Sequence, residues 1–141
     1  MNMQLSKNFY RLMFFFGALW NFSFAIPGLL FPEFSIKLTF GTEMDQSLLL
    51  GNYYAHSMYL FWWGAVLVFG IGYYLVSRDI NKNRGIVWMG IIGKLCFFFF
   101  LTCSYLTGKS TILSFLGGSG DFIFTILFLN FLWQTRNEAI R

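Results

Sequence analysis

Four apolar runs, each long enough to cross a lipid bilayer, constrain this chain more than any other feature. They cover residues 9–31, 48–76, 86–106 and 112–133. A hydrocarbon core about 30 Å thick needs about 20 residues of helix, and its backbone must be hydrogen-bonded within the segment. Each run therefore predicts a transmembrane helix. The connections are short, so consecutive helices are expected to be antiparallel neighbours. The sequence predicts an all-α fold: one membrane domain over residues 1–141, a polytopic four-transmembrane-helix antiparallel bundle.

The composition agrees with a chain whose surface contacts lipid. Hydrophobic residues make up 57% and charged residues 11%, whereas soluble domains average about 25% charged residues. Twenty Phe side chains in a soluble chain of this size would leave large exposed apolar patches. The net charge is +4, but the basic residues form no stripe, which argues against nucleic acid as a partner. The first apolar run is too long for a signal peptide, so it is expected to be retained.

The distribution of Lys and Arg predicts the orientation. One side of the membrane would hold seven basic residues: Lys7, Arg11, Arg78, Lys82, Arg84, Arg136 and Arg141. The other side would hold Lys37 and Lys109. Basic residues concentrate on the cytoplasmic side of membrane proteins. We therefore expect a multi-pass protein of the inner (plasma) membrane, with both termini and the 77–85 loop in the cytoplasm.

The connection after the first run has mixed signals. Pro27 is expected to kink or weaken the last turns of the first helix, and Pro32 to end it. Residues 34–40 alternate apolar and polar side chains, which suits a strand or an interfacial segment. The interfacial segment is favoured because no second strand is available to pair with it. Residues 42–45 resemble a capping box, and Ser47 is a second N-cap candidate.

Five polar residues lie inside the predicted helices or at their edge, and they are the candidate ligand-binding residues: Asn21, Asn52, His56, Lys94 and Asp121. A helix rises about 1.5 Å per residue, which places all of them except Asn52 near the midplane, one on each helix. Ionisable groups at this depth are costly and mark functional sites or buried pairs. Lys94 is long enough to reach Asp121. The same cluster would also serve a purely architectural role, fixing how the helices pack.

Helical spacing predicts an inward face on each helix, with small residues beside the polar ones. These faces are Gly17, Asn21, Ala25 and Gly28; Asn52, His56, Tyr59 and Trp63; Gly90 and Lys94; and Ser114, Gly117, Asp121 and Thr125. The glycines at 117–120 favour close helix packing over a loosened helix that exposes its carbonyls. Cys96 and Cys103 are too far apart on one helix for a disulfide, and we interpret them as buried packing thiols.

The sequence lacks the residues that several kinds of functional site require. His56 is the single histidine, so a multi-histidine metal site or a bis-histidine haem site within the chain is excluded, and neither a metal nor a cofactor is expected. Residues 108–111 resemble the end of a phosphate-binding loop, but Cys103 occupies the position of the required glycine. Serine-hydrolase and zinc-hydrolase constellations are missing.

A resemblance covers most of the chain. It rests on 69–74, on Arg78-Asp79, on Asn83-Arg84-Gly85, on Gly90 and Gly93-Lys94, and on Gly120-Asp121 with Phe122 and Phe128. With these motifs the chain resembles small, uncharacterised bacterial four-helix integral membrane proteins. The resemblance implies a fold and a bacterial inner-membrane setting, without an activity.

Three functions are compatible with these features. The first is binding or transport of a small molecule or ion at the intramembrane site, with Lys94 binding an anionic group or pairing with Asp121 and His56 exchanging protons. The second is an accessory subunit of a larger membrane complex. The third is a membrane enzyme acting on a lipid-like substrate, with His56 and Asp121 as acid and base. The lack of a nucleophile argues against the enzyme. A homodimer is a further expectation.

Overall fold

The structure, a computed structural model, describes residues 3–41 and 46–136, and within these ranges it contains helices and no strand. The helices are α1 (Met3–Leu30), α2 (Pro32–Phe40), α3 (Gln46–Leu50), α4 (Tyr53–Arg78), α5 (Arg84–Leu106) and α6 (Ile112–Gln134). Spans long and apolar enough to cross a membrane lie in α1, α4, α5 and α6. The prediction of an all-α four-helix membrane bundle is confirmed.

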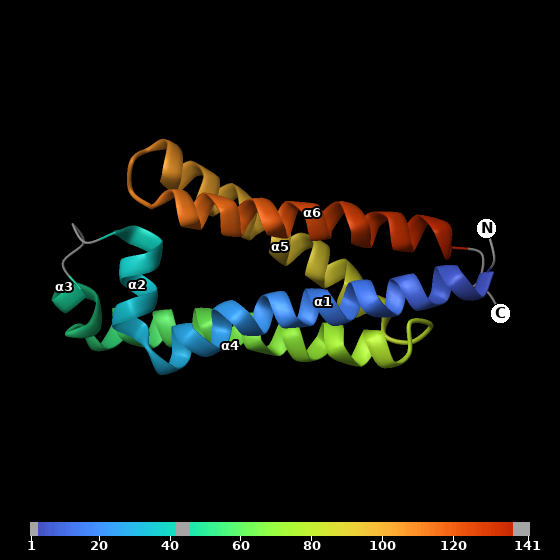
Figure 1. Cartoon of the computed structure of the whole chain (residues 1–141). Coiled ribbons are helices and arrows are strands. Elements are labelled where there is room, and N and C mark those ends of the chain that lie inside the picture. The colour runs from blue at the N-terminus through green and yellow to red at the C-terminus, as the bar shows by residue number, and fades with distance from the viewer. Residues whose placement is uncertain (1–2, 42–45, 137–141) are drawn as a thin grey trace.

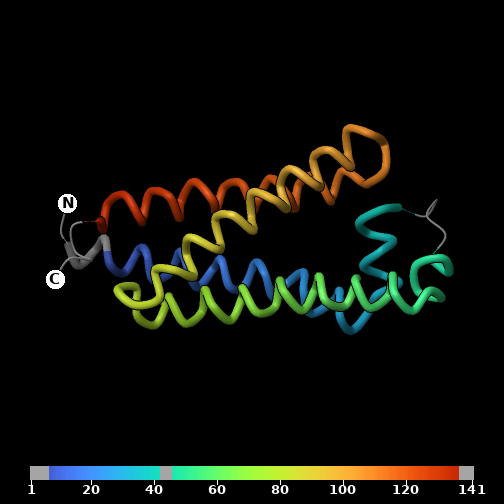
Figure 2. Tube along the Cα trace, turned by 180° about the vertical axis from the view of Figure 1, so that it is seen from behind, coloured from blue at the N-terminus to red at the C-terminus, as the bar shows by residue number. Residues whose placement is uncertain are grey.

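The long helices form two pairs that diverge along the molecule. Helix α1 packs along α4, and α5 packs along α6 (Figure 1). The pairs lie close together at the end where α1 begins and α6 ends, and they separate towards the opposite end. The view from behind shows α5 leaving α4 and crossing to α6 (Figure 2). The short helix α2 lies across the open end, between the two pairs.

The hydrophobic core fills the narrow end of the bundle. Its buried side chains come from all four long helices and the loop after α4: Tyr10, Met13, Phe14, Ala18, Tyr73, Val76, Ile80, Val87, Ile91, Phe128, Phe131 and Leu132. A smaller buried cluster of Ala25, Trp63 and Val66 joins α1 to α4 nearer the wide end. The narrow end is therefore tightly packed, whereas the wide end is held mainly by contacts within each pair.

Proline and glycine set the helix boundaries around α2. Helix α1 continues through Pro27 to Leu30, and the amide of Phe31 still donates to the Pro27 carbonyl at 2.8 Å. Pro32 then opens α2, at a first-turn position where its missing N–H costs no hydrogen bond. The predicted stop at Pro32 is confirmed. Gly41 follows α2 with a φ of 87°, a left-handed conformation that glycine adopts without steric strain.

Two predictions about the connecting region need correction. Residues 34–40 are helical in α2, so the strand alternative is wrong; the interfacial location stays a prediction. The second transmembrane helix begins at Tyr53 instead of residue 48, and Ser47 lies inside the separate helix α3 instead of capping a helix. Gly51 and Asn52 separate the two helices, and the Asn52 side chain caps α4 by accepting from the Ala55 amide at 3.1 Å. The possible capping box at 42–45 lies outside the described residues.

The cysteines do not pack in the core. Cys96 and Cys103 are free and exposed on α5, so the interpretation as buried thiols was wrong. Cys96 follows Lys94 by two residues, and two residues along a helix turn a side chain away from the face of the first. Because Lys94 points into the bundle, Cys96 points out of it.

Candidate ligand-binding site

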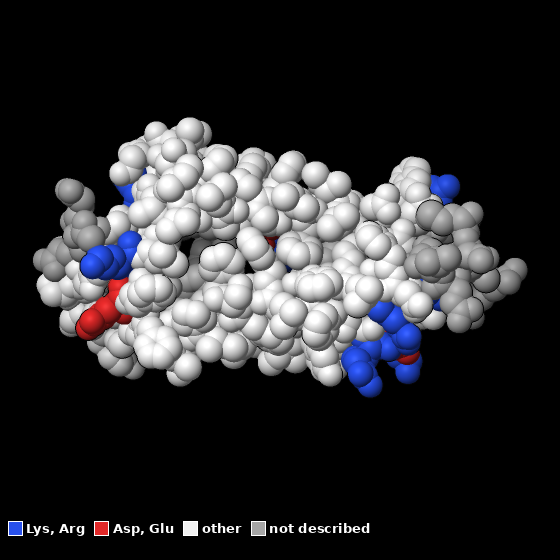
Figure 3. All heavy atoms as spheres, in the orientation of Figure 1, with Lys and Arg blue, Asp and Glu red and all other residues white. Residues whose placement is uncertain are grey.

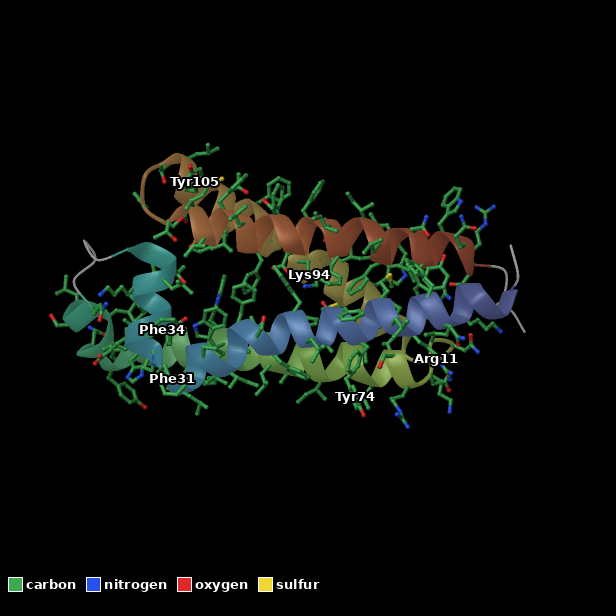
Figure 4. The ribbon with its side chains drawn as sticks, in the orientation of Figure 1. Arg11, Phe31, Phe34, Tyr74, Lys94 and Tyr105 are labelled. Carbon is green, nitrogen blue, oxygen red and sulfur yellow. The ribbon has the colours of Figure 1, made fainter. Side chains whose placement is uncertain are left out.

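Lys94 lies at mid-length of the bundle and joins three helices (Figure 4). From α5 its ammonium donates to Oδ1 of Asp121 on α6 at 2.5 Å and to Oδ1 of Asn21 on α1 at 3.0 Å. The rings of Tyr73 and Phe124 lie 5.4 and 5.2 Å from Nζ, close enough for cation–π attraction. The side chain is only 4% exposed. A buried cation is tolerated because it is paired and hydrogen-bonded in this way.

Asn21 extends the polar cluster to the fourth helix. Its Nδ2 donates to the carbonyl oxygen of Val66 on α4 at 3.0 Å, while its Oδ1 accepts from Lys94. Gly70 makes the approach of α1 to α4 possible, because a Cβ there would come 2.6 Å from the Phe22 ring and 3.2 Å from Cβ of Asn21. The predicted small-and-polar face of α1 is thereby confirmed as a contact face: Gly17, Asn21, Ala25 and Gly28 are all buried.

Asp121 is held from a second side by Trp20. The indole Nε1 of Trp20 donates to Asp121 Oδ1 at 3.2 Å, the same oxygen that accepts from Lys94. The indole lies directly over Gly120, where a Cβ would overlap the ring. Helix α6 is continuous through 117–120, and Gly118 packs against Leu101 on α5. These glycines thus serve close packing, as the favoured interpretation predicted.

A cavity of about 670 Å³ begins at this cluster and extends to the wide end of the bundle. Asn21 and Asp121 lie at its deep end, and its walls are mainly apolar side chains of α1, α2, α4, α5 and α6. Figure 3 shows this face of the molecule hollowed, with charged atoms visible at its middle and other charges gathered towards the two ends. The volume falls within the range of about 300–1,000 Å³ typical of small-molecule sites.

Helix α2 lines the wide end of the cavity and is hydrogen-bonded to the start of α6. Thr111 Oγ1 donates to the Leu38 carbonyl at 2.6 Å, Ser114 Oγ donates to the Thr39 carbonyl at 2.6 Å, and the Thr111 amide donates to the Thr39 carbonyl at 2.9 Å. The last carbonyls of a helix have no partner within it, so these hydroxyls satisfy groups that α2 leaves open. The hydroxyl of Thr111 also caps α6, where it accepts from the Ser114 amide.

The structure brings together three of the five candidate residues. Asn21, Lys94 and Asp121 are in direct contact, whereas Asn52 is exposed and caps α4. His56 is half-buried in the first turn of α4 and does not line the cavity. Both residues lie nearer the helix end than expected, because α4 begins five residues later than predicted. Sequence reasoning missed Trp20. The available signal was Gly120, next to Asp121, since a glycine leaves room for a large ring to pack against the helix.

No family model, curated protein or solved structure matches the chain. Across residues 3–41 and 46–136, no group of three or more His, Cys, Asp or Glu side chains is placed to hold a metal ion. Four helices are long and apolar enough to cross a bilayer, and their outward faces carry large apolar side chains. The chain is a multi-pass membrane protein. Its helices contact lipid, and charged and amide groups meet at its centre.

Proposed function

We propose that this membrane protein binds a small apolar or amphipathic molecule in the cavity between its two helix pairs. One observation carries the proposal: an apolar cavity of about 670 Å³ ends on the Asp121 carboxylate and the Asn21 amide. Binding sites for small molecules combine mainly apolar walls with a few polar groups that orient the ligand. The cavity lies between transmembrane helices, so the bilayer is the natural source of an apolar ligand.

The tryptophans provide a direct measurement. Of the five in the chain, Trp20, Trp62 and Trp63 line the cavity, whereas Trp88 and Trp133 are exposed elsewhere. In phosphatidylcholine nanodiscs, a Trp88→Phe/Trp133→Phe chain would keep only the three tryptophans that line the cavity, of which Trp62 is also 39% exposed. We expect 1-bromododecane, whose bromine quenches tryptophan on contact, to quench this chain saturably at low mole fraction.

Filling the cavity tests whether the quenching comes from binding. Gly117 on α6 lines the cavity, and Gly64 on α4 does not and has open space around it. Gly117→Leu should weaken the saturable quenching, while Gly64→Leu, the same change in another transmembrane helix, should leave it intact. Ala55→Phe, which fills the cavity from α4, provides a second variant if Gly117→Leu does not fold. Quenching that rises linearly in all variants would contradict the proposal, because it would reflect ordinary contact with lipid.

An architectural role is the second candidate. It is favoured by the closed contact of Lys94 with Asp121 and by the nearly complete burial of Lys94. In that case the chain would be an accessory subunit whose polar cluster only fixes helix packing. Saturable binding that Gly117→Leu removes would argue against this alternative.

For the orientation we propose both termini and the connection between α4 and α5 in the cytoplasm of a bacterial inner membrane. The proposal is supported by the seven basic residues that the sequence concentrates on that side. Helix α2 would then lie near the outer surface.

A further inference from the structure

The two carboxylate oxygens of Asp121 have different surroundings. Oδ1 accepts hydrogen bonds from Lys94 Nζ and Trp20 Nε1. No described residue donates a hydrogen bond to Oδ2. Oδ2 is also absent from the buried side-chain atoms without a partner among the described residues, so this oxygen is not fully buried. The side chain is 13% exposed and lines the cavity. Oδ2 is therefore a strong hydrogen-bond acceptor that a molecule in the cavity can reach.

The charge around this oxygen is balanced. The ammonium of Lys94 and the carboxylate of Asp121 neutralise each other at 2.5 Å. The other described side chains that line the cavity carry no charge. An anionic headgroup would face the Asp121 carboxylate, and a cationic headgroup would add a second positive charge beside Lys94. An unpaired charge is expensive in an apolar environment, so both headgroups are disfavoured.

The length of the cavity indicates how the rest of the ligand lies. Asp121 and Leu113 both line it and are eight residues apart on α6, which corresponds to about 12 Å along the helix. The walls beyond Asp121 include the aromatic side chains of Phe24, Trp62 and Phe97. An apolar chain or ring system fits this part, with its polar end at Asp121.

We propose that the ligand is a neutral lipid alcohol, an apolar body that ends in one hydroxyl group. The hydroxyl donates to Oδ2 of Asp121, and the apolar body extends towards α2. This inference rests on the proposed function, and it adds the chemical class of the ligand. A hydrogen bond to a charged acceptor in an apolar site is worth enough to discriminate about tenfold or more against an isostere that lacks the donor.

Competition against 1-bromododecane tests the headgroup. In the Trp88→Phe/Trp133→Phe chain in nanodiscs at pH 7, four twelve-carbon competitors would be compared at equal mole fraction in the lipid. They are dodecan-1-ol, dodecyl methyl ether, dodecyl phosphate and dodecylammonium. We expect dodecan-1-ol to relieve the quenching at a mole fraction about tenfold lower than the ether, and both charged competitors to be weaker than the alcohol.

A double variant tests the role of Asp121. Lys94→Leu/Asp121→Leu replaces the buried pair with apolar side chains of similar size, a change that often preserves stability. It should bind the alcohol no better than the ether, with the affinity for the ether unchanged. If the chain with Lys94 and Asp121 intact binds the alcohol and the ether equally, or prefers a charged competitor, the inference is overturned. The proposed function of the cavity would still stand. A lack of saturable quenching by 1-bromododecane would refute the proposed function itself.

Discussion

Lys94 Nζ lies 2.5 Å from Asp121 Oδ1, yet the two residues differ in their access to the cavity. Lys94 is 4% exposed and does not line the cavity, whereas Asp121 is 13% exposed and does. Lys94 thus neutralises Asp121 from the packed side, and Asp121 presents its second oxygen on the open side. Lys94 is thus the packed member of the pair, and Asp121 is the member that a ligand can reach. Stability and binding can therefore be tested separately.

Breaking this pair should destabilise the protein far more than removing it. Either Lys94→Met or Asp121→Leu leaves one charge buried without its partner, and we expect a loss of about 3–5 kcal/mol in the free energy of unfolding. The double variant Lys94→Leu/Asp121→Leu should lose much less, because no unpaired charge remains. Equilibrium unfolding in mixed micelles, followed by circular dichroism, measures these differences.

The exposed pair of Lys82 and Asp79 provides the control. Its atoms lie 3.5 Å apart, with side chains 76% and 44% exposed, so Lys82→Met should cost less than about 1 kcal/mol. If Lys94→Met and Lys82→Met destabilise the chain equally, Lys94 is not the buried counter-charge described above.

The central pair could be predicted from the sequence because helix geometry is regular. The rise per residue placed Lys94 and Asp121 at similar depths, and the spacing of small residues predicted the inward faces of α1, α5 and α6. The same arithmetic misplaced His56, because Gly51 and Asn52 delay the start of α4. An apolar run shows how far a membrane helix can extend, but its capping residues decide where it begins.

The cavity was beyond sequence reasoning for a different reason. It exists because the pair α1–α4 diverges from the pair α5–α6, and crossing angles depend on how side chains of different helices interlock. Residues 34–40 alternate like a strand but form α2, which lines the cavity and is held by hydrogen bonds to residues more than 70 positions away. The predicted homodimer stays a prediction.

Gly120 should be intolerant of even one methyl group. A Cβ at this position would overlap the Trp20 indole, which would have to leave Asp121 Oδ1. We expect Gly120→Ala to cost about 1–3 kcal/mol of stability through overpacking, and to shift the tryptophan emission. Gly64 has open space around it, so Gly64→Ala in the same type of helix should be neutral or slightly stabilising. The same loss in both variants would mean that helix flexibility, not contact with Trp20, is responsible.

The orientation can be read from single cysteines in the two loops. Cys96→Ala/Cys103→Ala removes the native thiols at exposed positions and should leave the fold intact. In that background we expect Lys109→Cys to react with a membrane-impermeant maleimide on intact spheroplasts, and Asn81→Cys to react only after the membrane is opened. Both positions are exposed, so accessibility within the protein does not favour either. The reverse pattern would place the termini on the outer side.

The hydrogen bonds between α2 and α6 should help to hold α2 at the wide end of the cavity. Ser114 Oγ donates to the Thr39 carbonyl of α2 at 2.6 Å, whereas Ser119 Oγ, five residues further along α6, donates to the Phe115 carbonyl of its own helix at 2.8 Å. Ser114→Ala therefore leaves the Thr39 carbonyl without this partner, and Ser119→Ala breaks no hydrogen bond between helices.

In hydrogen–deuterium exchange we expect the amides of α2 to exchange up to about tenfold faster in Ser114→Ala, because one hydrogen bond contributes about 0.5–1.5 kcal/mol to local stability. The amides of residues 66–76, in the packed half of α4, should keep their rates in both variants. If α2 exchanges equally fast in Ser119→Ala, or as slowly in Ser114→Ala as in the parent, the Ser114 hydrogen bond does not hold α2 in place, and the two hydrogen bonds from Thr111 and the apolar packing of α2 are sufficient.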